Sequence, residues 1–149
     1  LPDIPTRYLS FLSNMLEKEE FDLCTLVAPC KKHEIEAPQV VKAVISWDPE
    51  YFISDVPIGR AHYFSRAPIP FGSDVFWHHI GLYGWRRPAL KKFVESKPSK
   101  LEQIENLEQL RALELGMIIA TGKVDVPIAG IDTEQDLINI QKKMSNKNK

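Results

Sequence analysis

The chain has 149 residues, enough for one domain with a substantial core, and a formal net charge of −1 at pH 7. This near-neutral charge gives no general reason to expect nucleic acid or an anionic membrane as a partner. No apolar stretch approaches the roughly 20 residues of a membrane-spanning helix, and no signal peptide is visible, so we expect a cytoplasmic protein. Because the first residue is leucine rather than methionine, we also expect that an upstream segment was removed or left out.

Two cysteines, Cys24 and Cys30, are too few for a disulfide framework. Together with His33 they could form part of a metal site. Structural zinc sites, however, use four ligands at tighter spacing, and no fourth ligand is evident. We therefore expect two reduced thiols.

The first third of the chain predicts a helix followed by two strands. Residues 6–19 carry apolar side chains at helical spacing and predict an amphipathic helix. Residues 21–29 form a short, nearly continuous apolar run, which is typical of a strand covered on both faces. After a polar connection, the β-branched residues 40–47 predict a second strand. This alternation indicates an α/β domain.

The middle of the chain predicts a turn at residues 57–60, a short strand at 62–66 and an alternating strand at 75–85. The last strand places His79 and Tyr83 on one face, about 13 Å apart along the backbone at about 3.3 Å per residue. Gly81 lies between them and would leave room for a ligand. A lone histidine on a strand is more often structural, so both interpretations of His79 stay open.

Two helices are predicted next, at residues 88–95, with a basic surface that is expected to face solvent, and at residues 99–116. In the second helix, Ser99 and Glu102 form a capping box, and Gly116 suits the left-handed position past the end. The apolar residues of this helix wind around about two-thirds of its circumference, so different neighbours should cover it along its length.

Glu108 projects into that apolar sector, where an unpaired carboxylate would be costly. One interpretation is an ion pair with Arg111 one turn later. The other is that Glu108 and Gln109 face a polar pocket.

The end of the chain predicts strands at residues 117–120 and 124–128, then a helix that begins at Thr133 and runs to about residue 144. If Thr133 is the N-cap, Asp132 has a carboxylate free for a cation; alternatively, Asp132 is itself the cap. The local pattern does not choose between them.

Four stretches, in this order and spacing, resemble one family, the 3-deoxy-manno-octulosonate (Kdo) cytidylyltransferases or CMP-Kdo synthetases. They are YFSRAPIP at 63–70, HIGLY at 79–83, LEQIENLEQLR at 101–111 and GIDT at 130–133. The resemblance covers nearly the whole chain. It implies a single domain with an α/β nucleotidyltransferase fold, in which a mixed sheet is flanked by helices in a Rossmann-like three-layer arrangement.

The resemblance further implies transfer of CMP from CTP to Kdo with release of pyrophosphate, a step of lipopolysaccharide biosynthesis that depends on Mg²⁺. Arg66 would face the anionic sugar acid, and Asp132 would bind the magnesium ion. The remaining residues implied to hydrogen-bond the sugar are His79, Tyr83, Glu108 and Gln109. No catalytic residue is expected in this chain.

Members of that family begin with a strand, a loop around the CTP phosphates and a Gly-Asp motif, none of which this sequence contains. We therefore expect an N-terminally truncated chain that is inactive alone. The family implies a homodimer, for which Phe76, Trp77 and Trp85 are candidate anchors. Two alternatives stay open: a cytidylyltransferase for another sugar acid such as sialic acid, which residues 101–105 argue against, and a non-catalytic fragment for dimerisation or sugar-acid binding.

Overall fold

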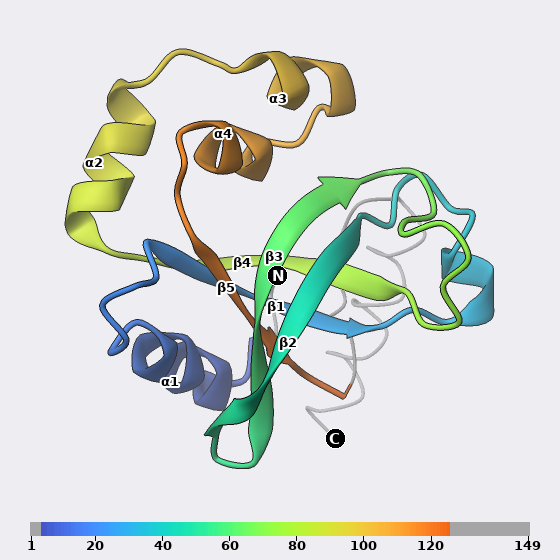
Figure 1. The fold of residues 1–149 in the computed structure, drawn as a ribbon, viewed down its shortest axis with the longest axis horizontal. Helices are drawn as coiled ribbons and strands as arrows, with labels where there is room; N and C mark the ends of the chain where they lie inside the picture. The colour runs from blue at the N-terminus through green and yellow to red at the C-terminus, as the bar shows by residue number, and fades with distance from the viewer. Residues whose placement is uncertain (1–3, 126–149) are drawn as a thin grey trace, which may run out of the picture.

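The computed structural model describes residues 4–125, which form five strands, four α-helices and one 3₁₀ turn (Figure 1). No helix in this part of the chain is long and apolar enough to span a membrane. In chain order the elements are α1 (Thr6–Met15), β1 (Leu23–Pro29), the 3₁₀ turn (Lys32–Glu34), β2 (Lys42–Ile53), β3 (Val56–Ser65), β4 (Trp77–Trp85), α2 (Arg87–Glu95), α3 (Lys100–Glu105), α4 (Gln109–Glu114) and β5 (Ile119–Lys123).

The strands form one mixed sheet in the order β1-β4-β2-β3-β5, and β5 returns to pair with β1 so that the ladder of pairings closes. Strand β1 lies parallel to β5 and antiparallel to β4. Every residue of β1 except Pro29 is buried. The predicted mixed sheet, and a strand covered on both faces near its start, are confirmed.

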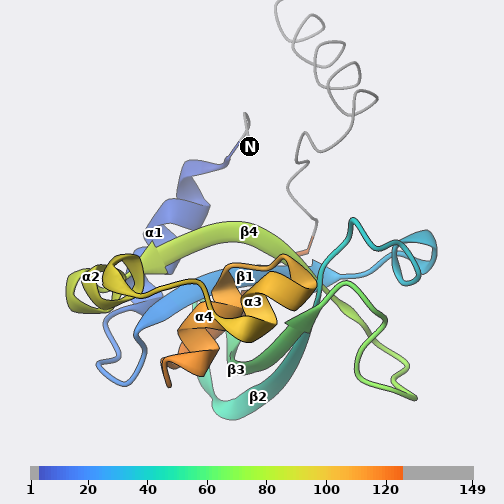
Figure 2. The same ribbon diagram turned by 90° about the horizontal axis from the view of Figure 1, so that it is seen from above.

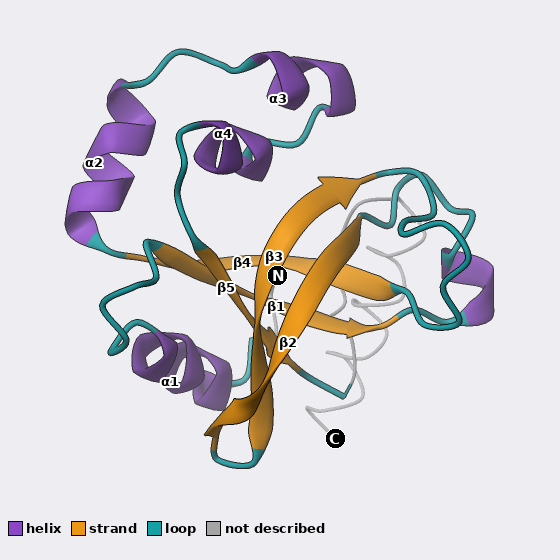
Figure 3. Ribbon diagram, viewed as in Figure 1, coloured by secondary structure: helices purple, strands orange, loops and turns teal. Residues whose placement is uncertain are grey.

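Helices cover the sheet on two sides (Figures 2 and 3). On one side α1 places Leu12 and Met15 in a cluster with Leu26 of β1. On the other side α2 and α4 contribute to a cluster that includes Val27, the next residue of β1. Because alternate residues of a strand point to opposite faces, β1 feeds both clusters. The helices α3 and α4 therefore lie on the face of β1 opposite α1.

The predicted turn at residues 57–60 is wrong, because these residues lie within β3. The chain reverses instead at Ser54 and Asp55, which have φ values of 49° and 63° and join β2 to β3 as a two-residue hairpin. Gly59 does not serve a turn. A Cβ added there would lie 2.7 Å from the Ser46 carbonyl oxygen, so glycine allows the two strands to approach closely.

The predicted single helix at 99–116 is also wrong, because the chain forms α3 and α4 with a break at Asn106. Asn106 adopts the left-handed conformation, with φ 55° and ψ 48°, which asparagine tolerates better than most residues. Both predicted ends are confirmed. The Ser99 N–H donates to Glu102 Oε2 at 2.9 Å, and Gly116, with φ 76°, follows α4.

The remaining predicted elements shift at their ends or lie beyond the described residues. The first helix ends at Met15 rather than at residue 19, and the strand expected at 117–120 begins at Ile119. The strand at 124–128 is described only as far as Asp125, where it is not a strand, and the terminal helix with Asp132 and Thr133 lies outside the described residues.

Two of the candidate dimer anchors pack within this chain. Trp77 contacts Trp47 with ring centroids 4.9 Å apart, and Trp85 contacts Phe93 at the same separation. Both tryptophans lie against the core cluster beneath α2 and α4. Packing within the chain therefore accounts for the presence of tryptophan at positions 77 and 85.

Candidate functional site

The five residues implied to bind the sugar gather around the α3–α4 junction, which we define as residues 105–109. Glu108 and Gln109 belong to the junction itself. His79 and Tyr83 lie on β4, and Arg66 directly follows the last residue of β3. The structure therefore brings together side chains that are separated by up to 43 positions in the sequence (109 minus 66).

His79 is buried, with 7% of its surface exposed, and both of its ring nitrogens have protein partners. Nε2 lies 3.0 Å from Thr25 Oγ1, and Nδ1 lies 3.5 Å from Gln109 Nε2. The Thr25 hydroxyl hydrogen is directed to the carbonyl oxygens of Ile80 and Leu82, at 3.0 and 2.9 Å. We therefore assign the ring proton to Nε2, which leaves Nδ1 to accept from the Gln109 amide.

The protonation state of His79 follows from its burial. Desolvation, and secondarily the nearby His78, lower the pKa of the imidazole to about 3. His79 is therefore neutral near pH 7. Its ring also packs edge-on against Phe64, with centroids 4.8 Å apart, so its orientation is fixed by packing as well as by hydrogen bonds.

Tyr83 contacts His79 directly, with ring centroids 5.5 Å apart. The expected gap for a ligand between the two side chains is therefore absent. A bulge in β4 places His79 opposite Val27 and Tyr83 opposite Thr25, only two positions apart along β1. A Cβ added at Gly81 would meet nothing within 4 Å, so the space there does not require a glycine. Burial, and secondarily the charge of Glu108, raise the pKa of Tyr83, which keeps the phenol protonated and able to donate.

Glu108 is exposed at the N-terminal end of α4, and Gln109 beside it is buried. The expected burial of Glu108 in an apolar sector is wrong, because that geometry required one continuous helix. Arg111 does not form its ion pair with Glu108 either. Its guanidinium pairs with Glu102 of α3, through Nε to Oε2 at 2.7 Å and through Nη2 to Oε1.

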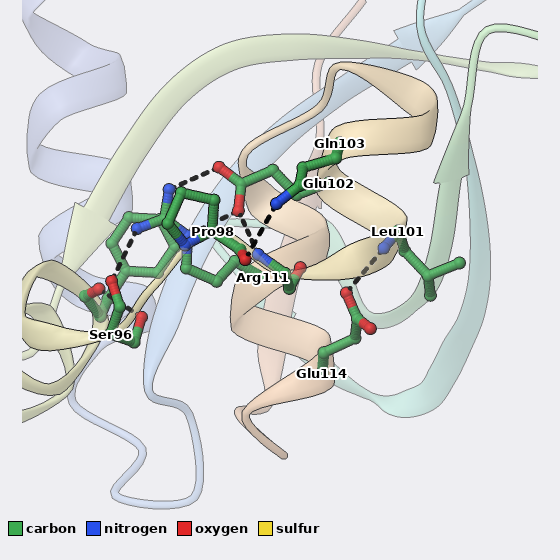
Figure 4. A network of polar contacts seen from close by, with 9 residues as sticks. Ser96, Pro98, Leu101, Glu102, Gln103, Arg111 and Glu114 are labelled. Atoms are coloured by element: carbon green, nitrogen blue, oxygen red, sulfur yellow. Dashed lines mark hydrogen bonds and ion pairs between the residues drawn. The ribbon is translucent and has the colours of Figure 1, made fainter.

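The Arg111 guanidinium ties three helices together (Figure 4). Besides Glu102, it donates to the Ser96 carbonyl oxygen at 3.4 Å and lies over the ring of Phe93 at 4.5 Å, at the end of α2. A second link joins the Leu101 N–H to Glu114 Oε2 at 3.1 Å. These contacts fix α3 against α4 and so set the position of the junction between them.

Arg66 reaches across the junction with its side chain. Nε donates to the Glu105 carbonyl oxygen at 2.9 Å, and Nη2 donates to that of Asn106 at 3.3 Å. Nη1 donates to the Pro38 carbonyl oxygen at 3.1 Å. An arginine has five N–H donors, so these three bonds orient the guanidinium and leave N–H groups for an anionic ligand.

Two residues that the sequence did not single out take part in this arrangement. Glu105 accepts hydrogen bonds from Ser65 and from the Arg66 N–H, and Lys42 donates to the Arg66 carbonyl oxygen. Ser65 and Arg66 each lie more than 20 positions away from Glu105 and from Lys42 in the sequence. The only local signal was Lys42 itself, a single charge within the β-branched run at 40–45.

The implied magnesium ligand, Asp132, lies outside the described residues. Within residues 4–125, no three or more histidine, cysteine or acidic side chains gather as a metal site would require. Cys24 Sγ donates to the Leu12 carbonyl oxygen at 3.2 Å, and burial raises the pKa of its thiol to about 12. Burial also raises the pKa of the Cys30 thiol, to about 11.

Known proteins resemble this chain over nearly all of its length. A family model described as cytidylyltransferase matches residues 2–119. The 3-deoxy-manno-octulosonate cytidylyltransferase of Bartonella bacilliformis is 41% identical over 147 residues, which cover 95% of this chain and 56% of that protein. Its counterpart in Rhizobium meliloti is 46% identical over 138 residues, covering 92% and 53%.

A solved structure of CMP:2-keto-3-deoxy-manno-octonic acid synthetase complexed with CTP has the same fold. It superposes with a TM-score of 0.81 at 29% identity, over 98% of this chain and 58% of the other. The chain thus spans about half the length of the relatives that it matches.

Proposed function

The chain belongs to the cytidylyltransferase family, and from this premise we propose that it supplies the sugar-acid side of an enzyme that transfers CMP from CTP to Kdo. The observation that carries this proposal is the clustering of Arg66, His79, Tyr83, Glu108 and Gln109 at the α3–α4 junction. The names of the relatives support the substrate pair.

In the proposed reaction a hydroxyl oxygen of Kdo attacks the α-phosphorus of CTP. A new O–P bond forms, the hydroxyl releases its proton to solvent, the bond between the α-phosphorus and the bridging oxygen breaks, and pyrophosphate leaves. Such transfers depend mainly on positioning the two reactants and neutralising phosphate charge. The role that we assign to this chain is to hold the sugar acid.

The chemistry at the junction suits a polyhydroxylated carboxylate. Arg66 offers a planar guanidinium with N–H groups left for a carboxylate. The protonated phenol of Tyr83 can donate a hydrogen bond to a sugar hydroxyl. The exposed carboxylate of Glu108 can accept one. Gln109 keeps its amide oxygen as an acceptor while its amide nitrogen faces His79. His79 itself can contact the sugar if the ligand replaces the long bond from Gln109.

We propose Asp132 as a ligand of Mg²⁺, as the resemblance implies. When bound, the ion would neutralise charge on the phosphates. Asp132 lies outside the described residues, so this role rests on the sequence alone.

A homodimer is proposed for the complete protein. Phe71 is fully exposed and Val75 is 49% exposed, both on the loop between β3 and β4, which is consistent with an apolar contact. Sedimentation of the chain extended to the length of its relatives should give a dimer at micromolar concentration. A monomer under these conditions would contradict this part of the proposal.

The function is tested by pyrophosphate release. The chain extended to the length of its relatives should release pyrophosphate from CTP only when Kdo and Mg²⁺ are both present, whereas the 149-residue chain alone should be inactive. Equal turnover with sialic acid would overturn the substrate assignment. Binding of Kdo by the extended chain without any turnover would favour a non-catalytic sugar-acid-binding protein.

A further inference from the structure

Lys42, the first residue of β2, is a fully buried lysine whose ammonium group is bonded only to main-chain carbonyl oxygens. Nζ donates to the carbonyl oxygens of Ala37 at 3.0 Å, Val40 at 2.7 Å and Arg66 at 2.6 Å. These three bonds use all of its N–H donors and join the start of β2 to the residue that follows β3.

Glu105, the last residue of α3, approaches Arg66 from the other side. Its Oε2 accepts from the Arg66 N–H at 3.2 Å, and its Oε1 accepts from Ser65 Oγ at 2.7 Å. Burial, and secondarily the Glu105 carboxylate, raise the pKa of Tyr63, two residues earlier on the strand. The carboxylate therefore joins α3 to the end of β3.

The two residues hold the main chain of Arg66 by its two polar groups. A carboxylate takes the N–H and an ammonium takes the carbonyl oxygen, while the guanidinium bonds to the carbonyl oxygens of residues 38, 105 and 106. Both main-chain polar groups of Arg66 and each of its three guanidinium nitrogens thus have a defined partner, so the two remaining guanidinium N–H groups have a fixed direction.

We propose that Lys42 and Glu105 are positioning residues that hold Arg66 in the orientation in which it receives the carboxylate of the sugar acid. This inference rests on the proposed function, because it assigns a role in binding the same substrate. Neither residue needs to touch the substrate. Their effect passes through the main chain of Arg66.

Stability alone does not account for Lys42. Taking an ammonium group out of water is costly, and buried charged groups can often be replaced by apolar residues of similar size without loss of stability. Burial is the main cause that lowers the pKa of Lys42. An apolar side chain would fill this position of β2 without these costs, but it could not hold the Arg66 carbonyl oxygen.

The test compares Lys42→Met and Glu105→Gln in the chain extended to the length of its relatives, with Arg66→Ala as the reference. Each of the first two variants should raise the KM for Kdo about tenfold and leave the KM for CTP within about twofold. The matched controls are Lys91→Met and Glu95→Gln on α2, whose side chains are 75% and 66% exposed. Both controls should leave the two KM values unchanged.

A double-mutant cycle separates positioning from a general structural role. In the Arg66→Ala background, Lys42→Met or Glu105→Gln should change the KM for Kdo by less than about twofold, because their route to the substrate is gone. If the effects multiply instead, or if both KM values rise together, the inference is wrong. Circular dichroism checks folding, and Glu105→Gln carries the test if Lys42→Met does not fold.

A second readout does not depend on activity. Absence of pyrophosphate release by the wild-type extended chain would overturn the proposed function. The positioning of Arg66 can still be measured in the 149-residue chain as slow hydrogen exchange of the Arg66 Nε–H by NMR. Both variants should accelerate that exchange, and unchanged exchange would overturn the inference.

Discussion

His79 shows how burial at a single residue determines the chemistry of the site. A histidine on a strand can serve as a ligand group, a proton carrier or a structural donor. Here the ring is buried between Thr25 and Gln109, and its pKa is lowered to about 3. It therefore acts as a neutral connector between β1 and α4, and we expect no proton transfer by this residue near pH 7.

The lowered pKa predicts a pH dependence of stability. Between about pH 6.5 and 3, His79 binds a proton in the unfolded chain but not in the folded one, so the free energy of unfolding falls as pH falls. Within this pH range, His79 makes the free energy of unfolding change by up to about 1.4 kcal/mol per pH unit. Above this range His79 adds no pH dependence. Urea unfolding of wild type and of His79→Gln at several pH values measures it.

The free energy of unfolding of His79→Gln should depend less steeply on pH near pH 5 than that of wild type. The difference in slope corresponds to about one bound proton. At pH 8, where His79 is neutral in both states, the difference between the two proteins reports only lost packing and hydrogen bonds. Equal slopes for the two proteins near pH 5 would show that His79 is protonated in the folded chain.

The sequence predicted some residues of the site but not those that hold them. Arg66, Tyr83 and Gln109 belong to stretches that resemble a known family, and the structure gathers them. Lys42 and Glu105 act through partners 24 and 39 positions away, at Arg66. Periodicity and capping rules are local, so they carry no information on such pairs.

The break between α3 and α4 is the element on which the site depends. It turns Leu107 and Leu110 into the core, with 6% and 0% exposure, while Ile104 stays 65% exposed. In one continuous helix Ile104 and Leu107, three positions apart, would lie on the same side, whereas here only Leu107 is buried. The wide apolar sector predicted for residues 99–116 was in fact the signature of two short helices with different orientations.

The break predicts an unusual order of stabilities at Asn106. Asn106→Ala should destabilise the chain by about 1–2 kcal/mol, because alanine is strained in the left-handed conformation. Asn106→Gly should cost less, since glycine adopts this conformation freely. The free energy of unfolding in urea measures both.

Gln103, an exposed position within α3, is the matched control. There alanine should be more stable than glycine by roughly 1 kcal/mol, as in any helix interior. If alanine is also the more stable residue at position 106, the chain is helical through the junction and the break is refuted.

Other elements were predictable to different degrees. The helix near residues 88–95 and the alternating strand near 75–85 were predicted within a few residues, because their patterns are regular. The hairpin between β2 and β3 was missed because Pro57 and Gly59 look like turn residues. The true turn at Ser54 and Asp55 lacks glycine, and only the strand pairing reveals it.

At the scale of the whole molecule, helices on both sides of a closed mixed sheet present one functional edge. The α3–α4 junction meets the end of β3 and the middle of β4 there, and the proposed sugar-acid residues come from all three. Figure 2 shows α3 and α4 together over the strands, away from α1. The chain spans about half the length of its relatives.

The central claim is that the α3–α4 junction binds the sugar acid. The most direct test is a crystal structure of the chain extended to the length of its relatives, soaked with Kdo. We predict that the carboxylate of Kdo lies within hydrogen-bond distance of the Arg66 guanidinium, and that sugar hydroxyls contact Glu108 or Gln109. Kdo bound elsewhere, with the junction free of ligand, would contradict the account.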